Sequence, residues 1–173
     1  MIISILAVIA VPSVVERMRE RRSAEAAQRI AALYRSARLR AMGRGAAVLV
    51  RYNAGTFSVL EATQGNVGVA AGCETLPLNS CTATSWLDVT TFDLPRRGEY
   101  EGVTVSARDA SDSSAATTQL DVCYTPLGRA FTRIVPANPF DPMTGVASFA
   151  VGRSGGLSRT VAVLPNGIAR LAL

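Results

Sequence analysis

The sequence contains no histidine, and arginine supplies all eighteen of its basic residues because lysine is absent too. Without histidine, Ser-His-Asp and Cys-His catalysis, histidine-containing zinc sites and histidine pH switches are excluded. The chain also lacks a glycine-rich phosphate loop and a close pair of carboxylates in a structured segment. We therefore expect no enzymatic activity, no cofactor and no small-molecule substrate.

A hydrophobic run long enough to cross a bilayer is also missing. The opening apolar run covers residues 1–11, is interrupted by Ser4 and stops at Pro12, whereas a spanning helix needs roughly 20 apolar residues. No basic residue precedes Ile2, so the run does not have the layout of a secretory signal. Three interpretations stay open: a buried core helix, an interfacial anchor, or the back half of a longer hydrophobic helix that starts upstream of Met1.

Cysteine is scarce, with three residues. Cys73 and Cys81 flank a short polar loop that contains a proline, and their spacing allows a disulfide in an exporting compartment. Cys123 lies in an alternating strand pattern and is expected to be a small buried side chain. No CxxC spacing occurs, so we expect no metal site. The sequence leaves the disulfide connectivity among the three cysteines open.

Two aspartates in a serine-rich segment form a candidate cation site. Asp109 and Asp112 lack the glycine and the terminal acid of an EF-hand loop around them. We therefore expect both carboxylates to lie in a solvated turn.

Charge is distributed unevenly along the chain, whose net charge is +5. Residues 1–44 contain nine arginines and three glutamates, a local charge of +6, and residues 45–173 contain nine arginines and ten acids, a local charge of −1. The basic character therefore belongs to the N-terminal segment. This argues against a nucleic-acid-binding module in the remainder.

A long helix is predicted over residues 14–42. Ser13 and Glu16 fit a capping box at its start, Gly43 and Gly45 end it, and Pro12 either ends or kinks a helix that begins at Ile2. Apolar residues recur at steps of three and four and form one narrow stripe suited to packing on a sheet: Ala24, Ala27, Ile30, Ala31, Tyr34, Ala37 and Ala41.

Beyond Gly45 the pattern changes to short β-rich segments separated by turn residues. Segments 46–52 and 56–61 predict a hairpin, and 67–71 is a weak strand or a loop. Further strands are predicted at 85–92, 103–107, 119–124, 129–135, 146–151, 159–164 and 168–173. We predict an α+β fold, in which a long N-terminal helix, the shaft (1–44), packs on an antiparallel β-sheet head (45–173).

Three segments resemble one protein family. Residues 2–13 look like the second half of the hydrophobic helix shared by type IV pilins and pseudopilins. Residues 120–129 resemble the strand and Gly-Arg turn of the GspH/FimT-like minor pilins, and residues 159–170 resemble their terminal hairpin. The family's leader, cleavage site, methylated residue and buried glutamate match nothing in this sequence, and we expect the start of the hydrophobic helix upstream of Met1.

The resemblance implies a structural minor pilin near the tip of a type IV pilus that helps to prime assembly. The alternatives are an H-type minor pseudopilin of type II secretion and a DNA-binding minor pilin of natural transformation. The resemblance also implies an inner-membrane protein with a periplasmic head that later enters the pilus or pseudopilus. Its partners would be other minor pilins or pseudopilins and the major pilin. The membrane and filament contacts would come from Ile2, Ile3, Ile5, Leu6, Val8, Ile9, Val11 and Pro12.

DNA capture in the family is linked to a Gly-Arg-x-Arg motif near the C-terminus. The matching positions here are Gly167, Ile168, Ala169 and Arg170. Arg170 is the candidate DNA contact, but Ile168 replaces the first arginine, and each lost phosphate contact weakens binding.

Overall fold

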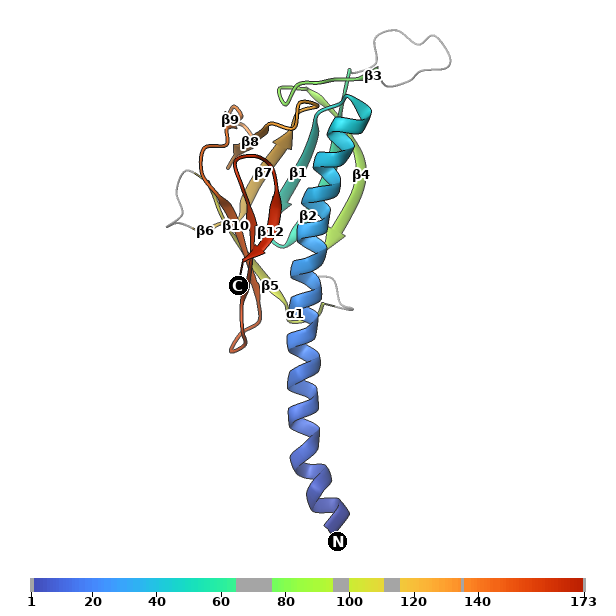
Figure 1. Ribbon diagram of the computed structural model, residues 1–173, viewed down its shortest axis with the longest axis vertical. Helices are drawn as coiled ribbons and strands as arrows, with labels where there is room; N and C mark the ends of the chain where they lie inside the picture. The colour runs from blue at the N-terminus through green and yellow to red at the C-terminus, as the bar shows by residue number, and fades with distance from the viewer. Residues whose placement is uncertain (1, 65–75, 95–99, 111–115, 135, 173) are drawn as a thin grey trace.

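The computed structural model describes residues 2–64, 76–94, 100–110, 116–134 and 136–172, and only the helical backbone of residues 2–15. Its first element is one continuous helix, α1 (Ile2–Arg44), of 43 residues. Figure 1 shows α1 running from the N-terminus, well outside the sheets, to the far end of the molecule along their surface. The predicted long helix is therefore confirmed.

The capping box predicted at Ser13 is wrong, whereas the alternative, a helix that begins at Ile2 and continues through Pro12, is confirmed. Ser13 lies inside α1, so it does not occupy a capping position, and Pro12 does not end the helix. At the other end, Gly45 adopts a φ of 68°, and its amide donates to the Ala41 carbonyl at 3.1 Å. This is the left-handed helix end that glycine favours.

Within the described residues, sheet A has seven strands, in the order β3-β2-β1-β7-β8-β9, with β4 also paired to β2. Its strands are β1 (Val48–Asn53), β2 (Thr56–Gln64), β3 (Leu76–Pro77), β4 (Ser85–Asp93), β7 (Gln119–Tyr124), β8 (Ala130–Arg133) and β9 (Asp141–Pro142). The predicted hairpin is β1–β2. Its two central residues, Ala54 and Gly55, both have positive φ, as a two-residue type I′ turn requires.

Sheet B has five strands in the part of the chain that the structure describes, in the order β12-β11-β10-β5-β6. Its strands are β5 (Thr104–Arg108), β6 (Ala116–Thr117), β10 (Ala147–Gly152), β11 (Arg159–Val163) and β12 (Ala169–Ala172). Every pairing between the described strands of both sheets is antiparallel. The predicted α+β class is confirmed, but the described residues of the head form two sheets where the sequence predicted one. The segment 67–71, predicted as a weak strand or a loop, lies entirely within residues 65–75, outside the described residues.

The main core lies between the second half of α1 and both sheets. The helix contacts β1 and β7 of sheet A and β10, β11 and β12 of sheet B. The predicted stripe faces this core, except that Ala24 is only half-buried and Ala26 is buried instead. Phe149 on β10 joins the three layers, with ring centroids 5.2 Å from Tyr34 on α1 and 5.6 Å from Phe57 on β2.

Candidate functional site

The first half of α1 projects from the head, and it is the segment that the sequence predicted to assemble with other subunits. Ser23 is the first buried residue among the described side chains, and residues 16–21 are all exposed. Since an α-helix rises 1.5 Å per residue, residues 2–22 extend about 30 Å beyond that point. Figure 1 shows this part of the helix without any other element beside it.

The predicted assembly residues all lie in the outer turns of this projecting helix. They are Ile2, Ile3, Ile5, Leu6, Val8, Ile9, Val11 and Pro12, and their side chains fall outside the described part of the chain. In the described residues, no helix carries an apolar stretch of the length needed to cross a membrane. Burial of these residues among neighbouring subunits therefore stays a prediction.

Charged side chains cover the next turns of α1. Arg21 and Glu25 form an ion pair at 2.8 Å, but their side chains are 82% and 40% exposed. An exposed pair of this kind contributes about 0.3–0.5 kcal/mol. Arg17 and Arg19 are exposed as well, so the charges of these turns face solvent.

Arg29 fastens the helix where it meets the head. Its guanidinium carbon lies 4.6 Å from the ring centroid of Phe92, and its Nη1 donates to the Tyr100 hydroxyl at 3.4 Å. A cation over an aromatic face contributes about 0.5–1 kcal/mol at a partly exposed site. This contact fixes the point from which the helix projects.

Glu61 fastens the other end of the helix. Arg40 and Arg44 each donate to one of its carboxylate oxygens at 2.7 Å, and the Glu61 side chain is only 3% exposed. Desolvation by itself would raise the pKa of Glu61, but the hydrogen bonds from Arg44 and Arg40 outweigh it, and the pKa lies below its usual value of 4.5. The carboxylate therefore holds the last turns of α1 against β2.

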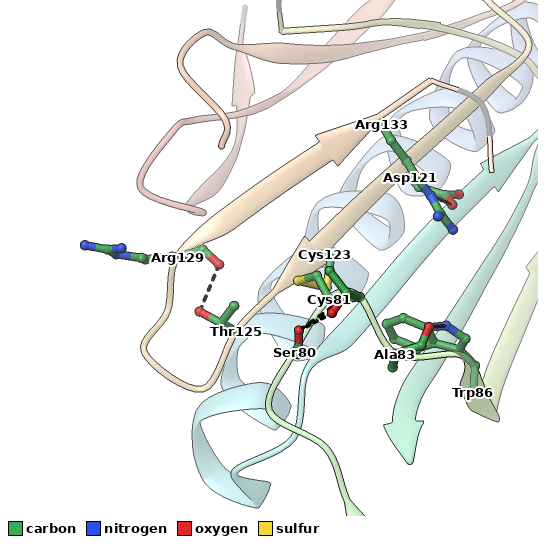
Figure 2. The surroundings of a disulfide bond; sticks show 10 residues. Ser80, Cys81, Ala83, Trp86, Asp121, Cys123, Thr125, Arg129 and Arg133 are labelled. Atoms are coloured by element: carbon green, nitrogen blue, oxygen red, sulfur yellow. Dashed lines mark hydrogen bonds and ion pairs between the residues drawn. A yellow bond between two sulfur atoms is a disulfide. The ribbon is translucent and has the colours of Figure 1, made fainter. Parts of the chain in front are cut away.

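A disulfide joins Cys81 to Cys123, with Cα atoms 5.9 Å apart. Figure 2 shows it linking the loop before β4 to strand β7. The predicted bridge between Cys73 and Cys81 is thus corrected: the partner of Cys81 is Cys123, and Cys73 lies outside the described residues. Cys123 is buried, as expected, but it is bonded.

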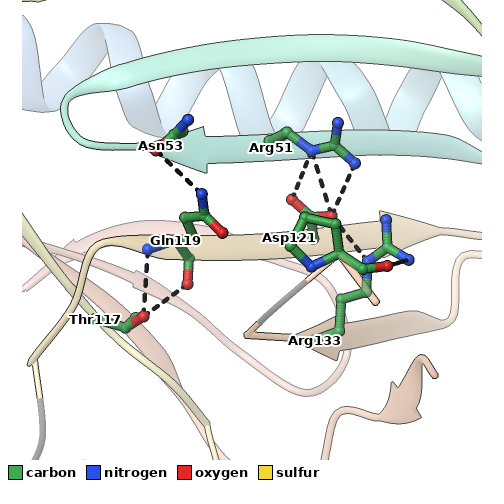
Figure 3. A network of polar contacts seen from close by, with 7 residues as sticks. Arg51, Asn53, Thr117, Gln119, Asp121 and Arg133 are labelled. Atoms are coloured by element: carbon green, nitrogen blue, oxygen red, sulfur yellow. Dashed lines mark hydrogen bonds and ion pairs between the residues drawn. The ribbon is translucent and has the colours of Figure 1, made fainter. Parts of the chain in front are cut away.

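Ionic contacts follow further along the same face of sheet A. Asp121 on β7 is 3% exposed, and it accepts from Arg51 Nε on β1 at 3.1 Å and from Arg133 Nε on β8 at 2.8 Å (Figure 3). Arg133 also lies 4.2 Å from the ring centroid of Phe140. These contacts tie three neighbouring strands together on the face away from α1.

The expectation for Asp109 is corrected, whereas Asp112 lies outside the described residues. Asp109 is 5% exposed, so it does not lie in a solvated turn. The described residues hold no group of three or more acidic or cysteine side chains that could bind a metal ion.

Gly167, the glycine of the predicted DNA motif, has a structural role that the motif did not reveal. Its φ is 77°, and a Cβ at this position would lie 3.0 Å from the Tyr124 ring and 3.2 Å from Arg38 Nε. Arg170 is exposed on β12, and Ile168 is 44% exposed. The DNA contact of Arg170 therefore stays a prediction. No sequence pattern marks Arg38 itself, although both glycines beside it, Gly128 and Gly167, belong to the segments that resemble the family.

Comparison with solved structures finds the type IV minor pilin FimU of Pseudomonas aeruginosa strain PAO1, in two crystal forms. One crystal structure is 16% identical, with a TM-score of 0.45, and the match covers 86% of this chain and 91% of that chain. The other is 17% identical, with a TM-score of 0.46, and covers 86% and 87% respectively. No protein-family model matches the chain, and none of the curated proteins does.

Proposed function

We propose that this chain is a structural subunit of a cell-surface filament of the type IV pilus class, and that it acts there as a minor pilin. The observation that carries this proposal is the continuity of α1. Its second half is part of the protein core, whereas its first half projects and ends in the apolar residues 2–11. A projecting apolar helix is stabilised when neighbouring subunits remove it from water.

In this proposal the chain divides into a shaft (1–44) and a head (45–173). The shaft would hold the subunit in the inner membrane before assembly and among other pilins or pseudopilins afterwards. The head would lie in the periplasm first and at the filament surface later, near the tip, where it helps to prime assembly. The disulfide supports an exported location, because such bonds persist in oxidising compartments.

The proposal is tested with two matched glutamate variants in a strain that lacks the chromosomal copy. Ile9→Glu places a charge in the apolar end of α1, and Met18→Glu places one at a position that is already 58% exposed. Burying a charge in an apolar helix bundle is costly, so Ile9→Glu should lower the amount recovered in sheared filaments at least roughly tenfold. Met18→Glu should be incorporated like the unaltered chain.

Immunoblots of sheared filaments measure how much of each variant is incorporated, and immunoblots of whole cells measure how much is expressed. Equal incorporation of the two variants would contradict the proposal, as would recovery of the unaltered chain only outside the filament fraction. If the strain without the chromosomal copy loses type II secretion but keeps its surface pili, the chain belongs to a pseudopilus instead.

A further inference from the structure

Arg38 lies on α1 between two tight turns of the head. The turn between β7 and β8 closes by a hydrogen bond from the Gly128 amide to the Thr125 carbonyl at 2.8 Å. The turn between β11 and β12 closes in the same way, with Gly167 donating to Leu164 at 2.7 Å. A Cβ at Gly128 would lie 3.3 Å from Arg38 Nη2, and one at Gly167 would lie 3.2 Å from Arg38 Nε. A side chain at either position would therefore force the guanidinium to shift by a few tenths of an ångström.

The guanidinium of Arg38 has one unsatisfied donor in the described part of the chain. Its Nε is buried and has no hydrogen-bond partner among the described residues, and the same is true of the neighbouring Tyr124 hydroxyl. Arg38 forms no ion pair with a described carboxylate. A buried donor of a charged group that stays unsatisfied costs free energy, which a bound anion would recover.

A groove opens beside Arg38 and has a volume of about 500 Å³. Arg129 stands at its rim, and Figure 2 shows this side chain extending away from its turn. Leu127, which is 86% exposed, lines this groove and also a second hollow of about 520 Å³. The remaining walls of the first groove are mostly apolar: Ala130, Phe131, Pro142, Met143 and Pro165.

Charge and polarity together define what this groove would bind. Its lining includes Arg38 and Arg129 but no acidic residue, so it is complementary to a negative group. Its apolar walls and the exposed Leu127 are complementary to hydrocarbon side chains. Nucleic-acid interfaces are more polar and more densely positive than this, and the head as a whole carries a charge of −1.

We propose that this groove is a docking site for a segment of another protein subunit, in which an aspartate or glutamate lies between apolar side chains. The carboxylate would bind Arg38 and Arg129, and the flanking side chains would lie on Leu127 and the apolar walls. This inference goes beyond the filament role, because it concerns a partner contact of the head and holds for any assembly that contains the chain.

The test starts from phage-displayed random 12-residue peptides selected on the immobilised full chain. The enriched peptides should share an acidic residue between apolar ones. The best peptide and its twin, with each acid replaced by the matching amide, are then compared by fluorescence polarisation. Since each charge-assisted hydrogen bond is strong, the twin should bind about tenfold more weakly or worse.

Three variants of the full chain separate this site from general charge effects. Arg38→Met keeps the aliphatic stem and should weaken peptide binding about tenfold, and Arg129→Gln, at the exposed rim, should weaken it about threefold. Arg170→Gln removes the same charge outside the groove and should change affinity less than about twofold. Thermal melting shows whether Arg38→Met is folded, and the comparison of the twin peptides on the unaltered chain does not depend on that variant.

Three results would overturn the proposal. One is a selection that yields no acidic consensus, and another is equal binding of the acidic peptide and its amide twin. The third is a 20-base-pair DNA duplex that displaces the peptide and loses affinity in Arg38→Met, since the groove would then belong to nucleic acid. None of these results bears on filament incorporation, so the two proposals fail separately.

Discussion

The two faces of sheet A are held by different forces. The inner face packs against α1 and sheet B in an extensive apolar core with several aromatic rings. The outer face has a smaller apolar cluster, covered by side chains such as Leu78, Trp86 and Phe140, and it adds the Cys81–Cys123 disulfide and the buried Asp121. Where little apolar surface can be buried, covalent and ionic cross-links supply the stability that packing supplies on the inner face.

The largest effect should come from the inner face. Tyr34→Ala removes a fully buried ring that contacts Phe57 and Phe149, and it should lower the free energy of unfolding by about 3–5 kcal/mol. Tyr34→Phe is the matched control. It should leave stability nearly unchanged, because the Tyr34 hydroxyl is buried without a hydrogen-bond partner in the described structure. Urea unfolding measures both, and a large loss in Tyr34→Phe would contradict this account of the core.

Removing the disulfide should destabilise the protein through the outer face of sheet A. The bond joins residues 42 positions apart, and the loop-closure relation gives about 4 kcal/mol for that length, within an observed range of roughly 2–5 kcal/mol. The double variant Cys81→Ala/Cys123→Ala should therefore melt at a lower temperature, as should the reduced chain. Adding a reductant should not alter the melting of the double variant. If the double variant were as stable as the oxidised unaltered chain, the disulfide would be dispensable for stability.

Asp121→Asn should have the next largest effect. The substitution keeps the size of the side chain but leaves Arg51 and Arg133 without their shared charge. Breaking a buried pair costs about 3–5 kcal/mol, and the partial exposure of Arg51, 36%, reduces this to about 2 kcal/mol. Asp88→Asn on exposed β4 is the control and should change stability by less than about 0.5 kcal/mol. If Asp121→Asn and Asp88→Asn lowered stability by similar amounts, the ion pairs of Asp121 would not stabilise the outer face of sheet A.

The smallest effect concerns Glu61, which links β2 to the end of α1. Its pKa is lowered in the folded protein, so its contribution is complete above its usual pKa of 4.5 and is lost as the pH falls through the folded value. At pH 7, Glu61→Gln should lower stability by about 1–2 kcal/mol. This difference from the unaltered chain should shrink between pH 5 and pH 3 in urea titrations, and a constant difference would exclude the linkage.

The sequence predicted the elements better than it predicted how they meet. The spacing of Ile30, Tyr34 and Ala37 located the buried face of the helix, and residues 119–124 matched β7, because these patterns depend on local periodicity. The disulfide depends on where the loop before β4 meets the distant strand β7. Cys123 stands opposite Leu49 on β1 and Phe131 on β8, and no local pattern encodes that register.

The candidate groove could not be predicted from the sequence either, because it also depends on contacts between distant segments. Gly128 and Gly167 belong to turns of different sheets, and only the fold brings both to Arg38. The arginine itself is one of nine in residues 1–44, and its spacing does not distinguish it from solvated neighbours such as Arg35.

Because α1 continues unbroken past Ser23, it fixes the direction in which the head faces around the helix axis. Because no loop separates the projecting turns from those in the core, the direction in which the head faces is set by the number of residues between them. Each residue turns an α-helix by about 100° and lengthens it by 1.5 Å. One alanine inserted after Arg22 would therefore swing the head about a quarter turn around the shaft while leaving both ends chemically intact.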